Sequence, residues 1–116
     1  MPKAIAALAL LFCSTGAFAQ VDGYSKLSGD LTITSENGDD PPPGAVKDRV
    51  GFVLYGASAK QVYDAMKVKP ALNICEDGMR IKTAGALECS RDERDNYTCM
   101  FAIMLANGRS RPFGSC

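Results

Sequence analysis

Four cysteines constrain the fold of this chain most, because its N-terminus indicates that they lie in an oxidising compartment. A single positive charge at Lys3 precedes an apolar run from Ala4 to Phe12, and the segment closes on Ala17-Phe18-Ala19 before Gln20. This order is typical of a secretory signal peptide that is cleaved after residue 19. The apolar run is shorter than the roughly 20 residues needed to span a bilayer. We therefore expect a signal peptide over 1–19, a secreted or periplasmic mature chain, and no membrane insertion after cleavage.

Removal of this segment also removes Cys13, which leaves an even number of cysteines: Cys75, Cys89, Cys99 and Cys116. An even count in a small exported chain predicts two disulfides. An alternative interpretation makes Cys13 the lipidated first residue of a bacterial lipoprotein. That processing requires a small residue before the cysteine, whereas Phe12 stands there, so the signal peptide is the better explanation.

The spacing of the cysteines favours one pairing. Cys89 and Cys99 are equidistant from Arg94, in the middle of the charged segment 90–96. If the flanking strands form a hairpin about this centre, the two cysteines face each other across adjacent strands, where a disulfide is feasible. Cys75 would then pair with Cys116. We predict 89–99 with 75–116, and the other two connectivities stay open because spacing alone does not choose among them.

Several kinds of chemistry are missing from the sequence. The chain contains no histidine, which excludes the usual serine and cysteine triads and histidine-ligated metal sites. The cysteines form no C-x-x-C motif, so redox catalysis and metal binding are not expected. The adjacent acids Asp39-Asp40 and Asp92-Glu93 lie in charged loops, where a catalytic carboxylate pair would lack rigid placement. We expect no enzyme activity, no metal and no cofactor.

The charge balance also narrows the range of partners. The chain has 13 Lys plus Arg and 13 Asp plus Glu, and loss of Lys3 leaves the mature chain close to −1. Nucleic-acid-binding domains usually carry a clear basic excess. We therefore expect another extracytoplasmic protein as the partner, and no nucleic acid.

Periodicity predicts an α+β fold. Leu27–Thr34 alternates in part and indicates a strand, and residues 36–44 are rich in Pro and Gly, which predicts an exposed loop. Val50–Tyr55 is a short apolar run typical of a buried strand. Ser58 followed by Gln61 matches a capping box at the start of a helix that spans about 58–68.

The C-terminal half adds further strands. Met79–Cys89 alternates but is interrupted by Gly85, which indicates a bulge within one strand. Tyr97–Leu105 is apolar on both faces, which predicts a central strand covered by the helix and by a neighbouring layer or a partner. Residues 109–116 form a short tail with a possible edge strand. Residues 20–116 should form one domain in which a single helix packs on an antiparallel sheet of about four strands.

Two surface features are candidate binding elements. The first is the charged segment between Cys89 and Cys99, and the second is the arginine-rich tail near Phe113. Together they comprise Arg91, Asp92, Glu93, Arg94, Arg109, Arg111 and Phe113. A loop fixed at its base by a disulfide loses little entropy on binding, and arginine beside an aromatic residue is typical of protein interfaces.

No motif places the chain in a named family, but its outline resembles small exported inhibitor and binding domains. The leading hypothesis is a non-catalytic binding module, with inhibition of a secreted or periplasmic enzyme as one form of it. The first alternative is a structural or assembly component of the cell envelope, self-associated through strand 97–105. The second alternative is a small hydrolase that uses Asp92 and Glu93 as its carboxylate pair.

Overall fold

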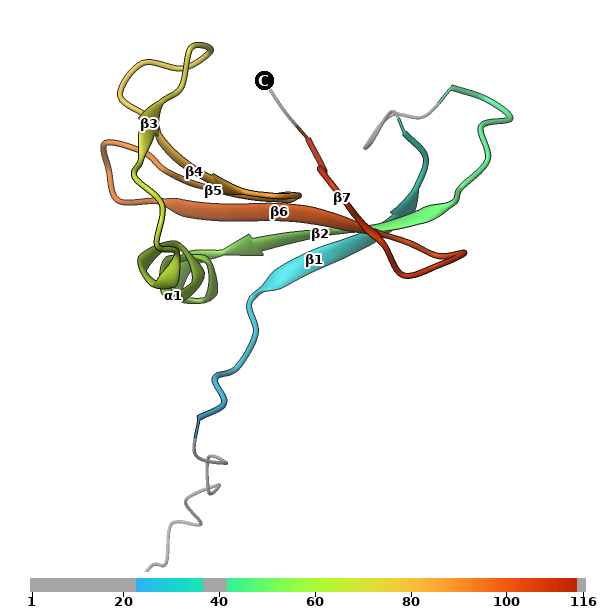
Figure 1. The fold of residues 1–116 in the computed structure, drawn as a ribbon, viewed down its shortest axis with the longest axis horizontal. Helices are drawn as coiled ribbons and strands as arrows, with labels where there is room; N and C mark the ends of the chain where they lie inside the picture. The colour runs from blue at the N-terminus through green and yellow to red at the C-terminus, as the bar shows by residue number, and fades with distance from the viewer. Residues whose placement is uncertain (1–22, 37–41, 115–116) are drawn as a thin grey trace, which may run out of the picture.

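The computed structural model describes residues 23–36 and 42–114, which form one twisted sheet with a helix on one of its faces (Figure 1). The predicted signal peptide, part of the Pro/Gly loop and Cys116 lie outside the described residues. The elements are β1 (Gly29–Thr34), β2 (Arg49–Tyr55), α1 (Gly56–Ala65), β3 (Ala71–Leu72), β4 (Arg80–Ala84), β5 (Leu87–Arg91), β6 (Tyr97–Met104) and β7 (Ser110–Arg111).

The sheet is antiparallel throughout and has the strand order β1-β2-β6-β5-β4-β3. The central strand β6 pairs with β2 along one edge. Its other edge is shared between β5, which pairs with residues 97–100, and β7, which pairs with Ala102 and Ile103. The α+β class is confirmed, but the prediction of about four strands was too low, since the described residues form a sheet of seven.

One of the additional strands arises because the segment that we expected to be one strand with a bulge forms two strands, β4 and β5. Gly85 instead lies in a two-residue turn between β4 and β5, with a φ of 58°. Glycine adopts positive φ without steric cost, and two-residue hairpin turns require it. The strand alternation on either side of Gly85 has the same period, so the sequence pattern does not distinguish a bulged strand from a hairpin.

The helix covers one end of the sheet and completes the core. Figure 1 shows α1 against the end of β2 and β6 where β2 leads into it. Its buried face presents Ala59 and Tyr63 to the sheet. The core cluster consists of Leu54, Ala59, Tyr63, Cys89, Tyr97 and Cys99. Among the described residues, no helix is long and apolar enough to cross a membrane.

The capping box predicted at Ser58 is absent. The helix begins two residues earlier, with Tyr55 at the N-cap and no side-chain capping bond. Ser58 is buried, and its Oγ accepts a hydrogen bond from the backbone N–H of Ser28 and donates one to the carbonyl of Lys26. The hydroxyl therefore joins the segment before β1 to the helix instead of capping it. The helix also ends earlier than expected, because Met66 is extended.

The opposite face of the sheet is covered by the chain that follows β7. Phe113 is buried, and its ring lies so close to Gly51 that a Cβ at position 51 would be only 2.5 Å from Cε2 of the ring. Ala102 pairs with Gly51 across β2 and β6 and is fully buried. The central strand is therefore covered on one face by α1 and on the other by this segment.

Candidate binding site at the end of the β5–β6 hairpin

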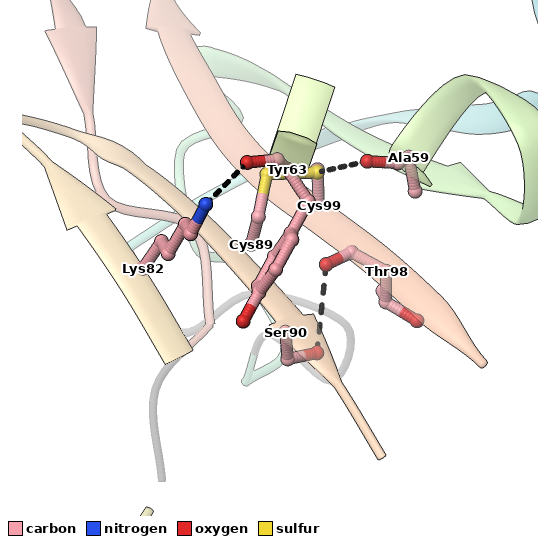
Figure 2. Close-up of a disulfide and its surroundings, with 7 residues drawn as sticks. All are labelled: Ala59, Tyr63, Lys82, Cys89, Ser90, Thr98 and Cys99. Carbon is pink, nitrogen blue, oxygen red and sulfur yellow. Dashed lines mark hydrogen bonds between the residues drawn. A yellow bond between two sulfur atoms is a disulfide. The ribbon is translucent and has the colours of Figure 1, made fainter. Parts of the chain in front are cut away.

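The hairpin of β5 and β6 is joined by a disulfide at its base. Cys89 and Cys99 are direct neighbours in the strand register and are bonded to each other. Both are fully buried beneath α1, and Cys99 Sγ lies 3.5 Å from the carbonyl oxygen of Ala59 (Figure 2). The predicted 89–99 pairing is thus present. The predicted partner of Cys75, Cys116, lies outside the described residues, so the 75–116 pairing stays a prediction.

The loop beyond this disulfide, residues 92–96, is named the tip loop, and Asp92 organises it. The Oδ1 atom of Asp92 accepts hydrogen bonds from the backbone N–H groups of Arg94 at 2.8 Å and Asn96 at 2.9 Å. Its Oδ2 atom accepts a third from the Asn96 side chain at 2.8 Å. These donors stabilise the ionised carboxylate, and the backbone hydrogen bond from Asn96 contributes most to lowering the pKa of Asp92 below its ordinary value. The tip loop is therefore held in one conformation by its own side chains.

An ion pair connects the end of β5 to the tip loop. Arg91 Nε donates to Asp95 Oδ1 at 2.8 Å. Asp95 has a φ of 59°, which places it in the left-handed region that few residues other than glycine, Asn and Asp adopt readily. The hydrogen bond to Asp95 is also the main cause of the raised pKa of Arg91. Both side chains are exposed, so this ion pair orients the loop more than it stabilises the fold.

A groove of about 690 Å³ lies between the tip loop and the start of α1, and we name it the tip groove. Its lining includes tyrosines, cationic residues, one acidic residue, one amide residue, one threonine and two small residues at the start of α1: Tyr55, Gly56, Ala57, Lys60, Arg91, Asp95, Asn96, Tyr97 and Thr98. The Nζ atom of Lys60 is 5.4 Å from the centroid of the Tyr97 ring. That ring packs edge-on against Tyr63 at 5.4 Å, which anchors it to the helix. Tyr55 is 44% exposed and so offers an accessible aromatic surface.

The acidic side of the tip loop faces the turn before β4. A shallower pocket of about 260 Å³ is lined by Glu76, Asp77, Asp92, Glu93, Arg94 and Asn96. Among the described residues, no group of three or more potential ligands is arranged to hold a metal ion. Both oxygens of Asp92 are used within the loop, and its lowered pKa is the opposite of what a general acid requires.

No family model, curated protein or solved structure matches this chain.

The structure divides the predicted site residues into two separate groups. Arg91 lines the tip groove, Asp92 holds the loop together, and Glu93 and Arg94 are exposed at its end. Arg109 and Arg111 are exposed beside the other end of β6, where β7 pairs with Ala102 and Ile103. At about 3.4 Å per residue, the five positions from Tyr97 to Ala102 separate the groups by roughly 17 Å. Phe113 is buried over Gly51 and contributes packing rather than accessible surface.

Sequence reasoning did not identify Tyr55, Lys60 and Tyr97 as part of the site. Each belongs to an element that the sequence did predict, but Tyr55 and Lys60 lie far from Tyr97 along the chain. Tyr55 pairs with Thr98 across β2 and β6, and this register brings the N-terminus of α1 beside the tip loop. The pairing of β2 with β6 skips over the intervening helix and hairpin, and no local pattern indicates it.

Proposed function

We propose that the chain is a non-catalytic exported binding module that engages another extracytoplasmic protein through the tip loop and the tip groove. In its most specific form, the proposal is that it inhibits a secreted or periplasmic enzyme by inserting the tip loop into that enzyme's cleft. The observation that carries it is the preorganised loop: Asp92 holds three donors, and the Cys89–Cys99 disulfide lies directly behind it.

Preorganisation matters because binding must otherwise order the loop, at a cost of about 0.5–1.5 kcal/mol for each flexible side chain. The surface composition supports the same proposal. Tyrosine and arginine are the residue types most enriched at the energetic centres of protein interfaces. The tip region offers Tyr55 beside Arg91, with Arg94 exposed at the end of the loop.

The test uses the oxidised protein as immobilised bait in the extracellular or periplasmic fraction of its source cells. A retained protein is then purified, and its affinity is measured against the double variant Tyr55→Ala/Arg94→Glu. We expect the affinity to fall by at least about tenfold, which corresponds to about 1.4 kcal/mol. The matched control is Arg109→Glu, which makes the same charge change at the distant end of β6 and should leave the affinity unchanged.

Two results would count against the proposal. If no protein is retained at micromolar bait, the module has no partner of useful affinity in that fraction. If Arg109→Glu weakens binding as much as the tip variant does, the tip is not the contact surface. Inhibition of the captured protein's catalytic activity by wild type, and its loss in the tip variant, would establish the more specific form.

A further inference from the structure

Strand β1 forms one margin of the sheet, and its outer edge has little of the usual protection against pairing. Among the strands of the described residues it pairs with β2, and in Figure 1 no other labelled element lies beyond it. Its six residues, Gly-Asp-Leu-Thr-Ile-Thr, pair with β2 in continuous register without a bulge. Exposed edges are commonly blocked by proline, by a bulge or by charged side chains, lysine above all. Strand β1 contains one charged residue, Asp30, and no proline, lysine or bulge.

The free backbone groups of β1 can be assigned from the bonds at its two ends. The carbonyl of Ser28 accepts from Tyr55, and that of Thr34 accepts from Asp48, so both point toward β2. Backbone groups along an antiparallel strand alternate in direction. The N–H and C=O groups of Gly29, Leu31 and Ile33 therefore point away from β2.

The same positions carry exposed apolar side chains. Leu31 is 65% exposed and Ile33 is 45% exposed. They lie opposite Phe52 and Val50 of β2, and Phe52 stacks on Phe101 with ring centroids 5.0 Å apart. The edge of β1 that faces away from β2 therefore lies next to apolar side chains on the sheet face. These side chains do not belong to the core cluster that α1 covers.

We propose that β1 pairs with β1 of a second copy of this chain, antiparallel and about a twofold axis at Leu31. Leu31 then lies opposite Leu31, and Gly29 lies opposite Ile33. All three residues direct their backbone groups outward, so this register allows each facing pair to exchange two hydrogen bonds. An isologous contact of this kind closes as a dimer.

The charge on β1 is compatible with this register. Asp30, the single charged residue of β1, lies opposite Thr32 of the other copy. A shift that centres the axis on Asp30 would place two carboxylates directly opposite each other, which is destabilising. A six-residue edge buries less than the standard interface of about 1,600 Å², so the dimer should form and dissociate with concentration.

The first experiment measures mass in solution by sedimentation and light scattering over a concentration series that reaches the millimolar range. Wild type should approach twice the mass of one chain. Leu31→Lys places two ammonium groups opposite each other and should remain monomeric. Asp30→Lys adds a lysine at the adjacent exposed position, opposite Thr32, and should still dimerise. A wild type that stays monomeric throughout the series would overturn the proposal.

The second experiment tests the register directly and does not depend on the lysine variants. Directly opposed residues of this kind have Cα atoms about 5.5 Å apart, which suits a disulfide. Leu31→Cys should therefore cross-link two chains under mild oxidation. In Ile33→Cys the two cysteines are offset by four residues, about 14 Å, and should not cross-link. Equal cross-linking at both positions, or at neither, would refute the twofold axis at Leu31, whatever the outcome for the tip loop.

Discussion

Lys82 of β4 donates a hydrogen bond from Nζ to the backbone carbonyl of Tyr63 at 2.9 Å, and the same Nζ stands 4.4 Å from the centroid of the Tyr63 ring. A second bond reaches the carbonyl of Met66 at 3.3 Å. Figure 2 shows this lysine reaching from the sheet to the helix beside the disulfide. The last turn of α1 contains no basic residue, so Lys82 supplies the positive charge that favours a helix C-terminus.

Replacement of Lys82 by methionine should lower the free energy of unfolding by about 1–3 kcal/mol. Methionine keeps much of the apolar stem but removes the charged hydrogen bonds and the contact with the ring. The measurement is urea unfolding under oxidising conditions. Lys67→Met, at an exposed position just after the helix, is the control and should change stability by less than about 0.5 kcal/mol. Equal effects at both positions would mean that Lys82 does not hold the helix end.

Replacement of Ser58 by alanine should cost about 1–3 kcal/mol, because the N–H of Ser28 loses its acceptor. The predicted role as a helix N-cap would give a different signature, namely a loss of helix content. We expect unchanged helical circular dichroism below the transition together with a lower unfolding midpoint. Ser90→Ala is the control, since its hydroxyl makes only a 3.5 Å contact with the carbonyl of Thr98 (Figure 2).

Substitution of Gly51 by alanine should destabilise the protein by about 1–3 kcal/mol, because the new methyl group would overlap the ring of Phe113. Phe113→Ala should also be destabilising, since it removes a buried aromatic side chain. The double variant should be more stable than the sum of the two single effects implies, because the methyl group added at position 51 then has space. Strict additivity in a double-mutant cycle would show that the two residues are not in contact.

Protonation of Asp92 at low pH should loosen the tip loop. Its pKa in the folded protein is lowered from the ordinary 3.8, chiefly by the backbone hydrogen bond from Asn96. A lowered folded pKa gives a stabilising contribution that is complete above the unfolded value and is lost as pH falls through the folded one. The amide proton shifts of Arg94 and Asn96 should therefore titrate together, with a midpoint below 3.8.

Asp92→Asn is the control for this titration. It should abolish the shared titration of the two amides. The titration of Asp48, whose pKa is also lowered by its hydrogen bond with Arg49, should stay unchanged. A midpoint above 3.8 would contradict the hydrogen-bond network described for the tip loop.

The local parts of the fold were predictable from the sequence. Partial alternation located β1, and apolar runs located β2 and β6, each to within two residues. The symmetry of Cys89 and Cys99 about Arg94 predicted both the hairpin and its disulfide. These features depend on neighbours along the chain. The turn at Gly85 was missed because strands on both sides share one period, and the two-residue strand β3 is too short to produce a pattern.

The candidate site was predictable only in part, for a related reason. The charged residues 91–95 are contiguous, so Arg91 and Asp92 could be recognised together. Tyr55 and Lys60 join them only through the register of β2 against β6. Phe113 was predicted as part of a binding surface because arginine beside an aromatic residue is typical of protein interfaces. Its burial depends on the absence of a side chain at Gly51, which lies far earlier in the chain.

The pairing of β2 with β6 also has a consequence for the order in which the protein folds. Two sets of strands are each made of near neighbours: β1 with β2, and β3 through β7. The pairing of β2 with β6 joins the two sets. It places Phe52 against Phe101, and nearly fifty residues separate them in the sequence. Loops of this length close slowly compared with hairpins. We therefore expect the pairing of β2 with β6 to limit the folding rate. Truncation of the Phe52 or Phe101 side chain should slow folding more than any change within a single hairpin.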